Sequence, residues 1–321
     1  MDTLKIGEVI AHPSIAEALH ASFGPAVPEK IEVLKGGLSG AVLLAVTVSA
    51  KRWVVRRVPR GPESDPAREL ACMERAAEQG IAPRLLYAKL DAEAAVSISE
   101  FVEAPTLVAW ARGGGGDCVP LLATLLRRLH DGAPFPPFAG VAAIAERIAG
   151  GLAARGPELS SLAEDAARVR VLNDALAPHA ELRPCHNDLN PGNILIDGDR
   201  AWLIDWAGAC GGDPFHDVAT PGVFIVRSEE DRTRLLSTYL GRAPNAIDSA
   251  RLLLSRALAL TAYSLMFAWV AQARRIVPPA GTPGAAPSAL EDPGAYGRGL
   301  AQQAAVLAAS AEYAVALATL R

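Results

Sequence analysis

Cysteine is scarce in this chain, and its few positions do not pair up. The 321 residues contain four cysteines, and none forms the closely spaced CxxC pair that is typical of zinc and redox sites. Disulfide frameworks belong mainly to short secreted chains. The spacing therefore predicts reduced thiols and a cytoplasmic protein. The cysteines are Cys72, Cys118, Cys185 and Cys210.

No charge of one sign dominates the sequence. Charged residues make up 21% of the chain, and the formal net charge is -4. A small negative charge spread along the chain argues against nucleic acid or an anionic membrane as the main partner. A small anion held by a local basic site is compatible with it. The length suffices for one large core or two linked lobes.

A secretory leader and a clear membrane span are also missing. The opening MDTLKIGEVIAHPS has neither the basic start nor the apolar run of a signal peptide. The most apolar stretch, residues 257–273, contains Thr, Tyr, Ser and Gln and is a little short for a bilayer span. We expect a buried helix there and no membrane partner.

The first hundred residues have the pattern of a β-rich unit. Two β-branched runs joined by residues 49–52 predict an antiparallel hairpin. The strand before it ends in the glycine-rich turn of residues 36–40. The expected strands are residues 31–34, 41–48, 53–58, 84–88 and 95–101.

One helix interrupts these strands. Asp65 suits the N-cap, Pro66 the first helical position and Gly80 the C-terminal end. Within this helix, Glu69 falls near one face with Met73, Ala76 and Ala77. Because a carboxylate on an inward face needs a partner, we expect a cation opposite Glu69.

After a connection near residues 100–106 the pattern is mainly helical. Leucines between 121 and 129 form an amphipathic stripe that predicts a core helix. We expect the helical pattern to be broken only by a hairpin at 185–206, with its turn at 197–199. Residues 278–293 are rich in Pro, Gly and Ala and predict a surface loop or lid. We predict two parts, residues 1–102 and 103–321, with a ligand cleft where they meet.

The hairpin carries the main chemical signal, CHNDLNPGNILIDGDRAWLIDW. Phosphoryl transfer from ATP needs a carboxylate at the acceptor hydroxyl, oxygen ligands for magnesium and a cation for the phosphates. Asp188 and, five residues later, Asn193 fit the carboxylate and a metal ligand, and Asp205 closes the next strand. Since Asn193 and Asp205 lie at the two open ends of the hairpin, we expect it to bring three oxygen ligands together.

The sequence HNDLNPGN followed by LIDW resembles the aminoglycoside phosphotransferase and choline kinase superfamily, and its wording is closest to the choline/ethanolamine kinase branch. GDPFHDVA, residues 212–219, resembles the segment that follows in the same enzymes. The resemblance implies an α+β, two-lobed, protein-kinase-like fold with a β-rich N-terminal lobe and a mainly helical C-terminal lobe. It implies ATP and Mg²⁺ as cofactors and a small-molecule hydroxyl acceptor. We expect a monomer or homodimer.

The resemblance also implies roles for single residues. Asp188 would be the catalytic base, His186 would orient its loop, and Asn193 and Asp205 would hold magnesium. On the third strand Arg56 matches the basic residue of the family, with Arg57 as the second choice. The remaining expected nucleotide contacts are Glu69 as partner of Arg56, Val54 as an apolar wall for adenine, Ser39 in the glycine-rich turn, and Glu100 and Val102 in the hinge.

Two departures from the family pattern affect these expectations. Arginine stands where lysine is commoner, and it keeps the charge and can bind phosphate bidentately. Ala207 stands where choline kinases usually have an acidic residue, which weakens the choline assignment.

The acceptor stays open between an amino alcohol such as choline or ethanolamine and an aminoglycoside-like antibiotic. The alternative from another class is a nucleotide-binding pseudo-enzyme that acts as a sensor or scaffold. Tyr263 and Phe267, spaced i and i+4, could form an aromatic box with Trp206 for a quaternary ammonium. We favour the alternative that they pack in the core.

Overall fold

The computed structural model describes residues 12–34, 41–61, 64–155, 161–273 and 292–321. Contacts divide the chain into two compact units. Unit 1 comprises Met1–Leu121, Arg127–Pro136 and Pro184–Gly211, and unit 2 comprises Leu122–Leu126, Pro137–Arg183 and Gly212–Arg321. The two-part boundary expected from the sequence, at residue 102, stays a prediction. The structure is mixed α+β, with an antiparallel sheet in unit 1 and mainly helices in unit 2, as predicted.

A five-stranded antiparallel sheet of order β1-β2-β3-β5-β4 forms the centre of the N-terminal part. The hairpin of β2 and β3 has a shorter turn than the predicted residues 49–52. Ser49 and Ala50 both take positive φ, and the second strand begins at Lys51 directly after them, because such a two-residue turn matches the twist of paired strands. The strands are β1 Lys30–Val33, β2 Val42–Val48, β3 Lys51–Pro59, β4 Leu85–Leu90 and β5 Ala94–Glu100.

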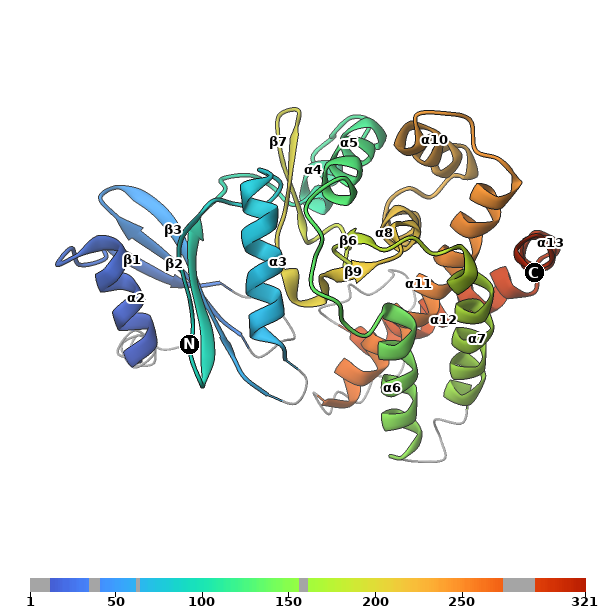
Figure 1. Ribbon diagram of the computed structural model, residues 1–321, viewed down its shortest axis with the longest axis horizontal. Helices are drawn as coiled ribbons and strands as arrows, with labels where there is room; N and C mark the ends of the chain where they lie inside the picture. The colour runs from blue at the N-terminus through green and yellow to red at the C-terminus, as the bar shows by residue number, and fades with distance from the viewer. Residues whose placement is uncertain (1–11, 35–40, 62–63, 156–160, 274–291) are drawn as a thin grey trace. The chain divides into compact units, whose positions relative to one another are not determined.

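Two helices cover opposite faces of this sheet (Figure 1). Helix α2, Pro13–Phe23, packs its Ile15 and Leu19 against Trp53 and Val55 of β3. Side chains alternate along a strand, so Arg56 points to the other face, where α3, Pro66–Glu78, lies. Arg57 points back to α2 and donates from Nε to Oγ of Ser14 at 3.2 Å.

Helix α3 begins as predicted. The side chain of Asp65 accepts a hydrogen bond from the backbone N–H of Arg68 at 3.1 Å, and Gly80 takes φ +66 just beyond the helix end. The buried face was predicted only in part. Glu69 and Ala76 are buried, but Arg68 and Cys72 take the positions beside them, while Met73 is only half-buried.

The predicted hairpin is present and belongs to unit 1. Strands β7, Ile194–Asp197, and β8, Arg200–Leu203, pair in antiparallel register, and Leu203 donates a backbone hydrogen bond to Ile81 after α3. The expectation that only this hairpin breaks the helical pattern was wrong. β6, Arg183–Cys185, pairs with β9, Cys210–Gly212, and three-residue strands are too short to leave a periodic signal.

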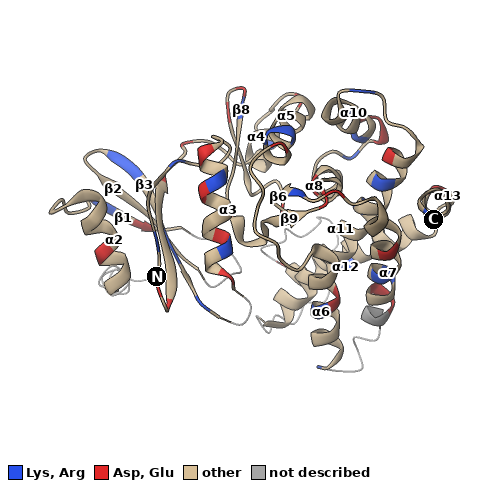
Figure 2. Cartoon of the chain, viewed as in Figure 1, with Lys and Arg blue, Asp and Glu red and all other residues tan. Residues whose placement is uncertain are grey.

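Helix α11, Ala246–Ala273, is the core helix of unit 2. It is long and apolar enough to cross a membrane by length and composition, but 61% of its most apolar window is buried inside the structure. Its Leu254 and Leu265 pack with Leu152 and Leu172, and the charged residues of the helix are confined to its N-terminal part (Figure 2). The helix is therefore buried, as predicted.

The other helices from α4 on are α4 Leu107–Arg112, α5 Val119–His130, α6 Val141–Ala153, α7 Ser161–Leu176, α8 Pro214–Ala219, α9 Pro221–Phe224, α10 Glu229–Leu240, α12 Pro293–Ala308 and α13 Ala311–Leu320.

Candidate active site

The loop between β6 and β7 places Asp188 in a network of amide hydrogen bonds. Asn190 donates from Nδ2 to Oδ1 of Asp188 at 3.0 Å, and Asn193 donates from Nδ2 to Oδ2 at 2.8 Å. Asn193 also donates to the backbone carbonyl of Asp188 at 3.0 Å. The carboxylate is half-buried, and these amide donors fix its orientation.

His186 ties this loop to the segment that carries Asp205. Its ring is fully buried, and its Nδ1 accepts the backbone N–H of Asp188 at 3.3 Å. The proton must therefore lie on Nε2, which donates to the carbonyl oxygen of Ile204 at 3.1 Å. Trp206 packs edge-on against the ring, with centroids 4.8 Å apart. His186 thus sits at the position predicted for a residue that orients the loop.

Asn187 forms a second connection and has a strained backbone. It takes φ +62, and its Nδ2 donates to the carbonyl oxygen of Gly208 at 3.1 Å. A Cβ at Gly208 would lie 3.3 Å from the carbonyl oxygen of His186, so glycine permits this close approach. Neither Asn187 nor Asn190 was singled out from the sequence, although both stand in the run HNDLNPGN.

The hairpin brings Asn193 and Asp205 to its open end, as predicted. Ile194 pairs with Leu203, and Ile204 donates a backbone hydrogen bond to Asn193 at 3.0 Å. Asp205 follows in the left-handed conformation, with φ +63. Since the amide nitrogen of Asn193 is used by Asp188, its Oδ1 remains for a metal. Oδ1 of Asn193 and the carboxylate of Asp205 are hard oxygen donors of the kind that magnesium prefers.

Arg56 joins the sheet to this site. Its Nη2 lies 2.6 Å from Oε1 of Glu69 and 3.2 Å from Oδ1 of Asp205. The side chains of Arg56 and Glu69 are only 12% and 8% exposed, so the pair is not an ordinary surface pair. Burial raises the pKa of the Glu69 carboxyl, and the Arg56 guanidinium opposes that rise. Of the two arginines considered, Arg56 faces the site and Arg57 does not.

The structure does not test the remaining predicted nucleotide contacts as such. Val54 is half-buried on β3 and pairs with Ser99. The carboxylate of Glu100 pairs with Lys51 and Arg84, and the carbonyl of Val102 accepts from Ala104. Ser39 and residues 278–291 of the predicted loop or lid lie outside the described residues. Of the last two residues predicted for that loop, Asp292 is the N-cap of α12 and Pro293 is its first residue.

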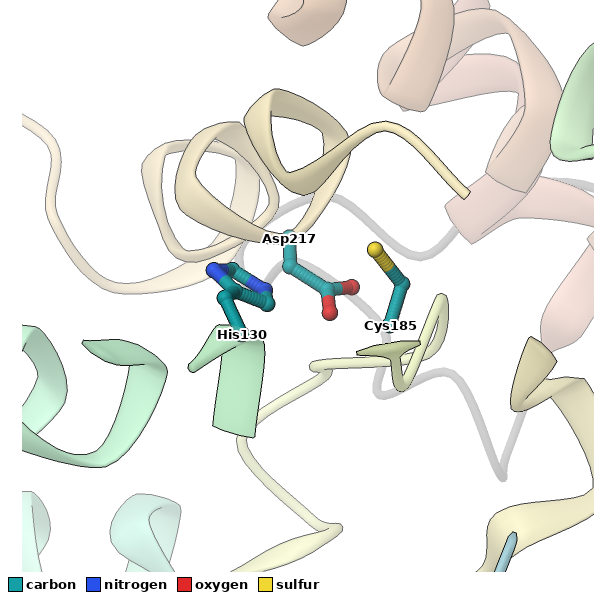
Figure 3. Close-up of side chains that lie close together, drawn as sticks. All are labelled: His130, Cys185 and Asp217. Carbon is teal, nitrogen blue, oxygen red and sulfur yellow. The ribbon is translucent and has the colours of Figure 1, made fainter. Parts of the chain in front are cut away.

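Three further ionisable side chains are buried in separate elements. Figure 3 shows His130 at the end of α5, Cys185 in β6 and Asp217 in α8. His130 and Cys185 belong to unit 1 and Asp217 to unit 2. A thiol is a soft ligand, so this group does not match a magnesium site, and we assign it no metal.

The segment after β9 is organised by Asp213. Its side chain caps α8 by accepting from the N–H of Phe215 at 3.1 Å and pairs with Arg251 at 2.8 Å. Burial raises the pKa of Asp213, while Arg251 opposes the rise. Asp213 therefore shapes this segment through a backbone hydrogen bond and an ion pair.

Four aromatic residues of unit 2 form a cluster that does not include Trp206. Phe224, Tyr263, Phe267 and Tyr296 follow one another with ring centroids 4.9, 6.4 and 5.1 Å apart. Tyr263 is buried, as expected of a core residue, whereas the other three rings are half-buried. Trp206 instead packs on His186 in unit 1.

Comparisons with known proteins agree with this architecture. The model of the phosphotransferase enzyme family matches residues 30–253. A choline/ethanolamine kinase family protein from Mesorhizobium loti superposes with a TM-score of 0.69 at 22% identity, covering 99% of this chain and 98% of that one. The choline kinase LicA from Streptococcus pneumoniae gives 0.66 at 18% identity, covering 98% and 99%.

Two further similarities complete the comparison. The aminoglycoside phosphotransferase APH(4)-Ia, in a ternary complex with AMP-PNP and hygromycin B, gives a TM-score of 0.58 at 16% identity over 92% of this chain and 99% of that one. Protein LicA of Haemophilus influenzae is 47% identical over 58 residues. That match spans 18% of this chain and 22% of the relative.

Proposed function

Because the chain belongs to the phosphotransferase enzyme family, we propose that it transfers the γ-phosphoryl group of ATP to a hydroxyl group of a small molecule. The observation that carries the proposal is that Asn193, hydrogen-bonded to Asp188, and Asp205, paired with Arg56, lie at the open end of one hairpin. These groups supply the base, the metal ligands and the phosphate cation that the reaction needs.

Each of these residues has a defined task in the proposal. A carboxylate oxygen of Asp188 accepts the proton of the acceptor hydroxyl. At the same time the hydroxyl oxygen bonds to the γ-phosphorus, and the bond between the γ-phosphorus and the β-phosphate oxygen breaks, so that ADP leaves. Asn190 and Asn193 hold that carboxylate in place. Arg56 places its positive charge at the phosphates, oriented by Glu69. Oδ1 of Asn193 and the carboxylate of Asp205 would hold magnesium, which when bound neutralises phosphate charge.

The structure of unit 2 favours an amino alcohol as the acceptor. Phe224, Phe267 and Tyr296 are partly exposed, and aromatic rings attract alkylammonium groups. The aminoglycoside-like acceptor remains the second candidate, supported by the fold shared with a phosphotransferase solved with hygromycin B.

The test is ADP release with ATP and magnesium in the presence of single acceptors. The panel contains choline, ethanolamine, thiamine, homoserine, several aminoglycosides and a macrolide, with an acceptor-free reaction as the blank. We expect turnover with an amino alcohol. Turnover with aminoglycosides alone would select the second candidate. Nucleotide binding without turnover on any acceptor would favour the pseudo-enzyme.

A further inference from the structure

Arg68 is a buried arginine that directs its charge to backbone atoms beside the candidate metal ligand. Its side chain is 5% exposed and lies on α3 one residue before Glu69. Nη2 donates to the carbonyl oxygen of Ala207 at 2.8 Å, and Nη1 donates to that of Ala209. Both carbonyls belong to the short segment that follows Asp205.

The surroundings of Arg68 explain why its charge is tolerated there. A planar guanidinium can donate to two acceptors at once, and two carbonyls of one segment accept it. Asp65, the N-cap of α3, has its Oδ2 3.6 Å from Nε of Arg68. One turn further along the helix, Sγ of Cys72 contacts the carbonyl oxygen of Ala209 at 3.5 Å. The same helix face therefore fixes the segment at two points.

Two neighbouring residues of α3, Arg68 and Glu69, are linked to Asp205 or to the segment after it. Glu69 binds Arg56, and Arg56 binds the carboxylate of Asp205. Arg68, next to Glu69 on α3, binds the carbonyl of Ala207, two residues after Asp205. Asp205 takes φ +63, a left-handed conformation that is unfavourable for a non-glycine residue and persists only where the surroundings hold it.

We propose that Arg68 is a positioning residue, which anchors the segment 206–209 to α3 and thereby holds Asp205 in its metal-binding conformation. The proposal deepens the proposed function and rests on it. Arg68 itself contacts neither phosphate nor metal in this account. Its loss acts through Asp205, in the way that residues behind metal ligands tune metal affinity.

The experiment compares Arg68→Met with Arg75→Met in the full chain. Arg75 lies two turns further along α3, is half-buried, and donates from Nη1 to the carbonyl oxygen of Pro134. Both variants thus lose one positive charge and an arginine–carbonyl contact of the same helix. Calorimetry measures AMP-PNP binding over a range of magnesium concentrations. Hydrogen exchange, without metal or nucleotide, follows the backbone amides of residues 205–211.

We expect Arg68→Met to raise the half-saturating magnesium concentration by about 10- to 100-fold, to leave metal-free nucleotide affinity within about twofold, and to speed exchange at 205–211. Arg68→Lys can reach one carbonyl, so its half-saturating magnesium concentration should lie between those of the wild type and Arg68→Met. It replaces Arg68→Met in the comparison if that variant does not fold. Arg75→Met should match the wild type in both readouts. An unchanged magnesium requirement in Arg68→Met, or an equal shift in Arg75→Met, would overturn the inference. If the wild type itself shows no magnesium-dependent nucleotide binding, the proposed function falls as well.

Discussion

Asn193 donates both of its amide contacts to Asp188, one to Oδ2 at 2.8 Å and one to the backbone carbonyl at 3.0 Å. One side chain therefore orients the proposed base through its nitrogen and keeps its oxygen for the proposed metal. Asn190 also binds the carboxylate of Asp188, at 3.0 Å. Asn190 donates to the other carboxylate oxygen and has no assigned contact with the metal. Both asparagines therefore orient Asp188, but only Asn193 is proposed to bind the metal as well.

Replacing each asparagine by alanine tests that separation. Asn193→Ala should lower kcat and also weaken magnesium-dependent nucleotide binding, by about tenfold or more, because a metal ligand and an orienting donor are lost together. Asn190→Ala should lower kcat and leave magnesium-dependent binding unchanged. Steady-state kinetics and calorimetry measure the two effects. Equal loss of magnesium-dependent binding in both variants would refute the assignment of Asn193 to the metal.

Asp205→Ala should damage magnesium-nucleotide binding more than any other single change in the hairpin. It removes the carboxylate that Arg56 contacts at 3.2 Å and that we assign to the metal. Asp199→Ala is the matched control, since Asp199 is exposed in the turn of the same hairpin. Calorimetry with AMP-PNP at fixed magnesium should show a large loss for the first variant and none for the second. Similar affinities in the two would contradict the role of Asp205.

Glu69→Gln should destabilise the protein and raise the KM for ATP, because Arg56 loses its buried counter-charge. Breaking a buried ion pair typically costs about 3–5 kcal/mol, and glutamine, which keeps a hydrogen bond, should come in below that range. Glu17→Gln is the control: Glu17 pairs with Lys89 at 2.5 Å on the surface, with both side chains about half exposed, and such pairs contribute about 0–1 kcal/mol. Urea unfolding and initial rates measure both variants. A Glu69→Gln protein as stable as Glu17→Gln would argue against the buried pair.

Cys72 should resist alkylation in the native protein. Burial raises the pKa of its thiol from 9.0 to about 12, so the reactive thiolate is nearly absent at pH 8. Iodoacetamide should label Cys118, which is half-buried, and spare Cys72 as judged by mass spectrometry of peptides. The folded state keeps a proton that the unfolded state releases, so this contribution to stability is complete below pH 9 and is lost as the pH rises toward 12. Rapid native labelling of Cys72 would contradict its packing against Ala209.

Much of the site could be predicted from the sequence, because its residues follow one another along a few strands. The spacing of Asn193 and Asp205 predicted that they meet at the end of a hairpin, and the resemblance to the family put Arg56 before Arg57. The prediction that a cation pairs with Glu69 followed from the position of Glu69 on the inward face of α3. These are local rules of strand and helix periodicity.

Other features could not be predicted, because they depend on contacts between distant segments. Arg68 meets Ala207 and Ala209 some 140 residues later, and no spacing within α3 indicates these partners. The three-residue strands β6 and β9 exist only because they pair with each other. Trp206, a candidate for an aromatic box, packs on His186 instead, which no spacing rule indicates.

The most direct test of the central claim is turnover by Asp188→Asn. Asparagine keeps the shape of the side chain but cannot accept the hydroxyl proton, so ADP release with the best acceptor should fall by at least about a hundredfold. Nucleotide affinity, measured by calorimetry, should stay within about threefold of the wild type. Near-normal turnover in this variant would show that Asp188 is not the base and would contradict the proposed chemistry.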